Sequence, residues 1–393
     1  MDWWISLRMK SKDPGARRKA IESLDVEHAI EPAMFELLAA CISDEEPQVR
    51  AAAAKALGSV QEERTTELLL GGLRDTNPEV RQAAAAALGR QKDCRAAGPL
   101  RAALKDASPK VRYSAAVALQ SVGWRPADDE EHALLDVALG DAQAAMFKGQ
   151  AAVNPLVSEL GGDSDSARRA AAAALEGVED PRRVQPLLAA LKDKEPTVCV
   201  SAIHALGKVT GEAVTRALLQ ALSDSEEKVR LAAAVVLGRR DNPEFVPQFL
   251  KLLDDSYFDV RLTAVQYLGR VRQPQTVAAL LPRLSDTVSD IRLATAKALG
   301  EIGSSAAIEA LVVALIDDER AVRHEAEVAL NQIDPHWAKS EAAQRACPVI
   351  ENLMKDRPAW VRAAATQVIA RLRPGAGANS PAPAFGGLRM AQS

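Results

Sequence analysis

The chain has 393 residues, of which 48% are hydrophobic but only 4% are aromatic, and its formal net charge is −4 with a pI of about 5.9. This acidic balance excludes a global field that would attract nucleic acid or an anionic membrane. The four widely spaced cysteines, Cys41, Cys94, Cys199 and Cys347, argue against a disulfide framework or a zinc site and indicate reduced thiols in a cytoplasmic protein. No apolar run approaches the ~20 residues that span a bilayer, and the first residues do not form a signal-peptide pattern.

A short phrase recurs along most of the chain at a spacing of 31 residues. It consists of an Asp, an Arg six residues later that follows Val or Ile, and an Ala-rich run that usually closes in Leu-Gly. The pairs are Asp44 and Arg50, Asp75 and Arg81, Asp106 and Arg112, Asp224 and Arg230, Asp255 and Arg261, Asp286 and Arg292, Asp317 and Arg323, and Asp356 and Arg362. Self-similarity at such a period predicts a solenoid, which is mostly surface and therefore usually serves to bind something.

The predicted elements in chain order begin with a degenerate first repeat at about 12–27, marked by Ala16-Arg17. Regular helix pairs follow, and then an irregular, shortened repeat at about 123–150, which could form a hinge or a notch. Beside it, Gly162 stands in an Asp slot and Cys199 in an Arg slot, so the Asp–Arg pattern is interrupted at two adjacent repeats. Regular repeats resume after this point. We expect one solenoid over 1–373 and a disordered tail at 374–393, which is rich in Gly and Pro.

Residues 243–272 show how one repeat is built. Apolar residues from Val246 to Leu253 recur at helical spacing, a polar turn follows, and a second apolar stripe runs from Val260 to Val271. Gly269 near the end of the second helix predicts a left-handed cap. The same slot is occupied by Gly58, Gly89, Gly207, Gly238 and Gly300. Each repeat is therefore predicted to be an antiparallel helix pair.

The repeated Asp and Arg are predicted to have a structural task. An acid at the turn between the helices could bond the backbone, or an Arg of the neighbouring repeat, and so form a charge-assisted ladder along the stack. At the two ends of the array, Trp3, Trp4, Trp337 and Trp360 are expected to cover the terminal repeats, since one face of each must otherwise meet water.

The phrase D-x-x-x-x-V-R-x-x-A-A-x-A-L-G resembles the HEAT repeats of the bilin-lyase (PBS lyase) HEAT-like type, and it covers about residues 12 to 373. The resemblance implies an all-α fold, a right-handed α-solenoid of 31-residue helix pairs. It is specific for the fold and weak for the function, because the family includes bilin lyase subunits, a di-iron hydroxylase and many adaptors.

In HEAT-like arrays the second helices line the concave face, where we expect a partner. The row Val200, Leu231, Leu262 and Leu293, one residue after each Arg slot, is apolar where a solvated face would be charged. These side chains form either an exposed strip for an acidic or amphipathic partner segment, or a half-buried packing surface. The predicted protein-binding residues are Tyr113, Val117, Val200, His204, Leu231, Val235, Arg239, Leu262, Gln266, Arg270, Leu293, Lys297, His324 and Val328.

Other functions find less support in the residues. Nucleic-acid binding would need concave aromatics and a clearly basic groove. His324-Glu325 matches the slot in which deoxyhypusine hydroxylase carries iron ligands, but one imidazole and one carboxylate are too few for a di-iron centre. Cys199 and His204 could form a nucleophile and base, although a buried thiol that fills the Arg slot is the favoured interpretation.

The sequence thus predicts a non-catalytic, monomeric, cytoplasmic scaffold that binds a protein partner and neither nucleic acid nor membrane. We expect no catalytic residue, no metal and no cofactor. The alternative is an enzyme of the same repeat family, first a bilin lyase subunit and second a deoxyhypusine hydroxylase.

Overall fold

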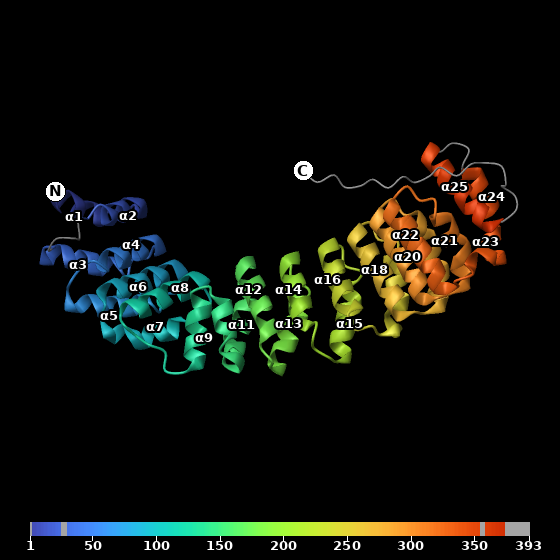
Figure 1. Cartoon of the computed structure of the whole chain (residues 1–393). Coiled ribbons are helices and arrows are strands. Elements are labelled where there is room, and N and C mark those ends of the chain that lie inside the picture. Colours follow the sequence, from blue (N-terminus) through green and yellow to red (C-terminus); the bar gives the residue numbers. More distant parts are fainter. Residues whose placement is uncertain (1, 25–29, 354–357, 374–393) are drawn as a thin grey trace, which may run out of the picture. The chain divides into compact units, whose positions relative to one another are not determined.

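The computed structural model describes residues 2–24, 30–353 and 358–373 (Figure 1). Asp356 of the last predicted Asp–Arg pair and the tail predicted at 374–393 lie outside these ranges. Within them all regular structure is helical and no strand occurs. The chain divides into two compact units, unit 1 (Met1–Val214) and unit 2 (Thr215–Ser393), and the boundary falls inside helix α15 (Glu212–Ala221).

Unit 1 is a stack of helix pairs. We call the leading helix of each pair a first helix and the following one a second helix, and Figure 1 shows them in two layers. The first helices are α1(Asp2–Met9), α3(Pro32–Cys41), α5(Glu63–Gly72), α7(Ala97–Ala103), α9(Asp129–Ala138), α11(Val153–Leu160) and α13(Val184–Ala190). The second helices are α2(Pro14–Glu22), α4(Pro47–Leu57), α6(Pro78–Gln91), α8(Pro109–Ser121), α10(Ala142–Met146), α12(Asp165–Ala174) and α14(Pro196–Leu206).

Unit 2 repeats this arrangement after α15. Its further first helices are α17(Val246–Leu252), α19(Val277–Leu280), α21(Ile308–Ala314) and α24(Cys347–Leu353), the last preceded by the short α23(Glu341–Arg345). Its second helices are α16(Glu227–Gly238), α18(Phe258–Val271), α20(Ser289–Ile302), α22(Arg320–Ile333) and α25(Ala359–Leu372). Short 3-10 turns such as η5(Pro243–Phe245) and η7(Leu281–Ser285) flank or lead into several first helices. The predicted all-α solenoid of helix pairs is confirmed.

The core of each unit is built from the slots that recur in the sequence. In most repeats the Val or Ile that precedes the ladder Arg and the Leu that closes the Ala-rich run are buried, as at Val80 and Leu88 in α6. First helices contribute one large side chain each to the same layer, for example Leu69 and Leu100. Alanines between them let the second helices of successive repeats pack directly on one another. The core is therefore continuous from repeat to repeat within a unit.

The predicted Asp–Arg ladder exists, and its geometry is the same at most repeats. Arg50 donates from Nε and Nη2 to the two carboxylate oxygens of Asp75 in the next repeat, at 2.7 and 2.9 Å. Its Nη1 donates to the backbone carbonyls of Asp44 and Glu45 in its own inter-helix turn, at 2.8 and 3.0 Å. Equivalent bidentate contacts join Arg17 to Asp44, Arg81 to Asp106, Arg168 to Asp193, Arg230 to Asp255, Arg261 to Asp286 and Arg292 to Asp317.

The carboxylate side of each contact fixes a second turn. Asp75 Oδ1 also accepts a hydrogen bond from the backbone N–H of Asn77 at 2.8 Å, and Asn77 is the N-cap residue of α6. The hydrogen bond from Arg50 lowers the pKa of Asp75 below its usual value by more than burial raises it. One Arg and one Asp thus hold two successive turns in register, and the carboxylate is held in its charged form.

At the irregular repeat the ladder departs from the sequence prediction. Gly162 does occupy the Asp slot, but Glu159, one turn earlier in α11, receives a hydrogen bond from Nη2 of Arg112 across the irregular segment. The predicted interruption at Gly162 is therefore wrong, because a carboxylate on a longer side chain reaches the guanidinium from a neighbouring position. At Cys199 the Arg contact is absent as predicted, and the thiol donates to the Asp193 carbonyl at 3.3 Å, which is the acceptor that an Arg would use.

The glycine slot has a different role from the predicted one. Gly89 and Gly269 lie within α6 and α18. The left-handed conformation occurs three residues after the glycine, at Lys92 and Arg272 in these two repeats and at Asp241 and Gly303 in two others. A Cβ added at Gly89 would lie 2.9 Å from the Cα of Ala118 in α8. At Gly269 it would lie 2.8 Å from the Cβ of Ala298 in α20. At Gly58, Gly89, Gly269 and Gly300 the slot needs Gly because the next second helix crosses there at backbone contact distance. Gly58 and Gly207 are C-cap residues, but neither has a left-handed conformation.

The ends of the array differ from the predicted pattern in part. At 12–27 the structure places α2 in a complete pair with α1, and Arg17 makes the full ladder contact described above. Trp337 is buried, with the Arg371 guanidinium 5.0 Å from the ring centroid, and Arg323 lies 4.9 Å from that of Trp360. Of the four tryptophans predicted to cover the ends, Trp337 is the buried one, whereas Trp3, Trp4 and Trp360 are 77%, 50% and 44% exposed, so their covering role stays a prediction.

The ladder predicts a pH-dependent loss of stability. We expect Asp75→Asn to destabilise the protein by about 1–3 kcal/mol at pH 7, because Arg50 keeps its position but loses a charge-assisted partner. The pKa of Asp75 is lowered in the folded state, so its contribution is complete above the unfolded value of about 4 and is lost as the pH falls through the lower folded value. Urea unfolding at several pH values should show the difference between variant and wild type shrinking below about pH 4. A constant difference down to pH 2 would contradict this role.

Close helix crossing gives a second prediction, with a matched control in unit 1. Gly89→Ala should lower stability by about 1–3 kcal/mol, because the added methyl group meets the backbone of Ala118. Gly98 also lies in a helix, α7, but a Cβ there would have no atom within 4 Å. Gly98→Ala should be neutral or stabilising by up to about 1 kcal/mol, since Ala is the better helix former. Thermal unfolding followed by circular dichroism compares the two, and equal effects would exclude the crossing as the cause.

Candidate functional site

The predicted protein-binding residues lie on the second helices of both units. Four belong to unit 1, namely Tyr113, Val117, Val200 and His204, and the other ten belong to unit 2. Within unit 2, α16, α18, α20 and α22 are packed in succession, so their equivalent positions form neighbouring steps of one surface. We call this surface the second-helix face and describe it separately for each unit.

Burial decides between the two predictions for the apolar row. Val200, Leu231, Leu262 and Leu293 are all half-buried, which matches the packing alternative better than an open strip. Val235 and Val328 are half-buried as well, whereas the exposed members are Tyr113, Val117, His204, Arg239, Gln266, Arg270, Lys297 and His324. The row therefore forms the floor between helices, and the residues one turn further along form most of the accessible surface.

In unit 2 the structure brings four predicted residues together around one hollow. Gln266 and Arg270 from α18 face Leu293 and Lys297 from α20 across a space of about 310 Å³. The basic margin is partly engaged within the protein. Arg270 donates to Asp241 Oδ1 at 3.1 Å and to the Gly238 carbonyl at 2.8 Å.

A neighbouring arginine is engaged in the same way. Arg240 Nη1 donates to Thr215 Oγ1 at 3.2 Å, and burial lowers the pKa of Arg240. Arg270 is exposed as well, so Lys297 and Arg239 are the exposed predicted Lys and Arg residues of this face for which the described residues show no acceptor. The attraction to an acidic partner is therefore weaker than the sequence alone indicates.

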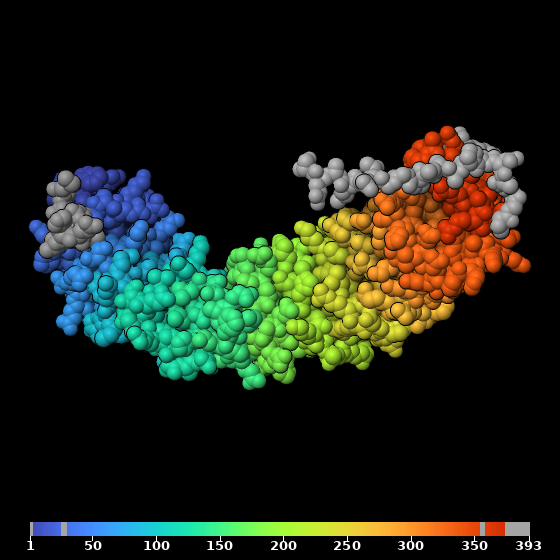
Figure 2. Space-filling model, viewed as in Figure 1, coloured from blue at the N-terminus to red at the C-terminus, as the bar shows by residue number. Residues whose placement is uncertain are grey.

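In unit 1 the second-helix face carries a larger groove at the irregular repeat. Tyr113 borders a groove of about 630 Å³ whose walls come from the starts of α6, α8 and α12, and the blue-green and green surfaces of unit 1 meet there in Figure 2. Tyr113 is 54% exposed and Val117, one turn further on the same side of α8, is 40% exposed. The other lining residues are Pro78, Glu79, Gln82, Ser108, Pro109, Lys110, Asp163 and Ser164. We call this feature the notch groove.

Sequence reasoning named Tyr113 but missed the residues that line the notch groove with it. Gln82 and Asp163 lie in repeats on either side of the irregular segment, and their proximity arises because α10 is only five residues long. The available signal was the jump of the Val slot from 111 to 167, which indicated a notch but not its walls.

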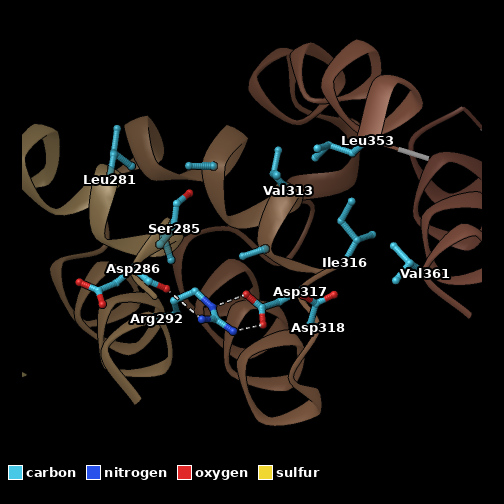
Figure 3. Close-up of a pocket in the computed structure, with 13 residues that line it drawn as sticks. Leu281, Ser285, Asp286, Arg292, Val313, Ile316, Asp317, Asp318, Leu353 and Val361 are labelled. Carbon is cyan, nitrogen blue, oxygen red and sulfur yellow. Dashed lines mark hydrogen bonds and ion pairs between the residues drawn. The ribbon is translucent and has the colours of Figure 1, made fainter. Parts of the chain in front are cut away.

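A further hollow in unit 2 lies over a ladder contact (Figure 3). It measures about 460 Å³, and apolar side chains such as Val313, Ile316 and Val361 form its walls above Arg292 and Asp317. All three guanidinium nitrogens of Arg292 already donate to protein oxygens. This hollow therefore has apolar walls and lies over an ion pair. Every guanidinium nitrogen of that pair already has an acceptor in the protein.

Comparison with protein families agrees with this geometry. A family model described as HEAT repeats matches residues 1–77, 66–154, 153–224, 215–296 and 277–370. The chain belongs to the HEAT-repeat family. This confirms the resemblance drawn from the repeated phrase, and the HEAT repeats extend over nearly all of the sequence.

Solved structures and curated proteins add little on function. The HEAT-repeat chain is similar to an engineered protein (20% identity, 94% of this chain and 98% of that one, TM-score 0.41) and to Escherichia coli YibA (19%, 75% and 98%, 0.36). It is also similar to human deoxyhypusine hydroxylase (22%, 76% and 94%, 0.28). No curated protein matches the sequence. Similarity at this level carries no argument about activity.

Two other properties of the described residues concern metal and membrane. In residues 2–24, 30–353 and 358–373, no group of three or more His, Cys, Asp and Glu side chains is arranged to hold a metal ion. His324 is exposed on α22 beside the half-buried Glu325. No helix in the same ranges combines the length and apolar character needed to cross a bilayer.

The half-burial of the apolar row is testable on one helix. Leu262→Asp should destabilise the protein by about 1–2 kcal/mol more than Gln266→Asp, because it places a charge in the floor between α18 and α20. Both substitutions put Asp into the interior of α18, so the helix-propensity cost is similar in each and the difference reports burial. Urea unfolding measures both variants. Equal destabilisation would mean that Leu262 is open to solvent.

Proposed function

We propose that this HEAT-repeat protein is a non-catalytic scaffold whose second-helix face binds an amphipathic segment of a protein partner. The observation that carries the proposal is the exposure of Tyr113 and Val117 beside the notch groove. Within the described second helices of unit 1, these are the large apolar side chains left exposed, and they lie on one side of one helix; Phe147, which caps the C-terminus of α10, is exposed as well. Exposed aromatic and aliphatic anchors beside a groove are typical of protein-binding surfaces.

The walls of the notch groove indicate the character of the partner. Prolines and short polar side chains line most of it, while Glu79, Lys110 and Asp163 supply charges of both signs. A mixed rim around an apolar anchor suits a segment with one apolar face and polar flanks rather than a strongly acidic one. The hollow around Lys297 in unit 2 is a second contact point, and because Glu301 lines it as well, it also offers charges of both signs. We propose that the protein acts as a monomer in the cytoplasm.

The enzymatic alternatives have no comparable support. A di-iron hydroxylase needs several imidazole and carboxylate ligands, and His324 with Glu325 supplies one of each. Cys199 is buried and hydrogen-bonded to Asp193, so the predicted thiol–His204 pair has no exposed nucleophile. No particular residue of this chain supports a bilin lyase-like role.

The test is affinity capture from the native host with a double variant, Tyr113→Asp with Val117→Asp, read by mass spectrometry against wild type. Both side chains are exposed, so the variant should keep its stability within about 0.5 kcal/mol, as checked by thermal unfolding. We expect at least one partner protein to fall by tenfold or more in the catch.

The matched control is Ala102→Asp, which places the same charge at an exposed position of the first helix α7. It should retain every partner. If the double variant and the control capture the same proteins in the same amounts, the notch groove is not the binding site.

A further inference from the structure

A cavity separate from the second-helix face lies inside unit 1 at the irregular repeat. It measures about 240 Å³ and lies between the end of α7, the first turn of α8, and the first helices α9 and α11. Apolar walls come from Leu104, Leu134, Val137, Ala138 and Pro155. Arg112 and Glu159 also line it, and we call it the α9 cavity.

Arg112 is the ladder arginine whose contacts differ at this point. In seven other repeats Nε and Nη2 both donate to one Asp, whereas Arg112 donates from Nη2 alone to Glu159. Its Nη1 keeps the two turn carbonyls, of Asp106 and Ala107. Nε therefore has no acceptor in the described part of unit 1, although only 7% of the residue is exposed. The Nε atom is not among the fully buried side-chain atoms that lack a partner, so it stays in contact with solvent and can donate to a ligand that enters the α9 cavity.

Glu159 supplies the complementary group. Its Oε2 accepts the Arg112 bond, while Oε1 accepts no hydrogen bond within the described residues, and the residue is as buried as Arg112. Because Nη2 and Oε2 are bonded, the free Nε donor and the free Oε1 acceptor belong to adjoining groups. The α9 cavity thus combines one free donor and one free acceptor with apolar walls, and Lys105, Glu130, Asn154 and Ser158 complete its lining.

We propose that the α9 cavity binds a small neutral molecule with an apolar body and an amide-like edge, in which a carbonyl accepts from Arg112 Nε and an N–H donates to Glu159 Oε1. The opposite charges of the two residues compensate each other. An anionic ligand would meet the Glu159 carboxylate and a cationic one the Arg112 guanidinium, and the other two charged residues of the lining, Lys105 and Glu130, are also of opposite sign. A neutral edge with one donor and one acceptor satisfies both residues and leaves the ion pair intact.

The repeat break explains why such a site exists here and not along the regular stack. In seven other repeats the Asp of the next repeat takes both Nε and Nη2, so the guanidinium has no nitrogen without an acceptor even where a hollow lies over the contact, as at Arg292. Here the Asp position is Gly162, and the carboxylate comes from Glu159, one turn earlier. The Arg112 guanidinium therefore has a carboxylate partner for Nη2 but not for Nε. This site is independent of the proposed protein-binding face.

The test uses the full chain and benzamide as the probe, with benzoate and benzylamine as matched anionic and cationic probes of the same size. Saturation-transfer NMR titrations give the dissociation constants. We expect benzamide to bind with a Kd of about 1 mM, and the two charged probes at least about tenfold more weakly. Absence of benzamide binding at ten times that concentration would overturn the proposal.

Two variants separate a specific site from non-specific binding. Ala138→Leu should fill the cavity and remove benzamide binding, whereas Ala102→Leu, an exposed position on α7, should leave it unchanged. Glu159→Gln leaves the Arg112 charge uncompensated, so benzoate should gain about tenfold in affinity and become the preferred probe. Benzamide affinity unchanged by Ala138→Leu would place the binding elsewhere and contradict the proposal, even if the Glu159 variant does not fold.

Discussion

At seven repeats the guanidinium of the ladder arginine connects three parts of the solenoid that would otherwise be independent. Arg50 binds two carbonyls of its own inter-helix turn and the carboxylate of the next turn, and that carboxylate in turn holds the N-terminus of the next second helix. Arginine is required because its planar fork offers parallel donors to a carboxylate while its third nitrogen serves the backbone. Hydrophobic burial along the repeats fixes distance, but this contact fixes how one turn is placed over the next.

Features with functional potential occur where this regular contact is altered. At the irregular repeat the next Asp is missing, Glu159 substitutes from α11, and the shortened α10 leaves the notch groove on one side and the α9 cavity on the other. Where the spacing lengthens near the C-terminus, a hollow lies over the Arg292–Asp317 contact. A regular solenoid buries its own ladder, so a change of repeat length is what opens space beside buried charges.

Small residues decide what the second-helix face can offer. Gly89 and Gly269 bring successive second helices to backbone contact, which leaves little room between them and turns the apolar row around Leu262 into a floor. Side chains one turn away, such as Gln266 and Lys297, are then the accessible ones. The accessible side chains of the second-helix face are therefore mostly polar in unit 2, whereas the face of unit 1 carries the exposed Tyr113, which serves as the apolar anchor in the proposed binding role.

The sequence by itself determined the repeat, the helix pairs, the buried Val and Leu slots and the existence of the ladder. Each of these follows from a residue pattern that recurs from repeat to repeat. It also located the irregular segment, since a jump in the Val slot is visible without coordinates. Only the tertiary structure decided that Glu159 replaces the missing Asp, because a contact between residues 47 positions apart leaves no periodic trace. It also decided that the glycine slot serves helix crossing and that Leu262 is half-buried, since both depend on how closely the next repeat approaches, which is set by packing between helices and not by any single one.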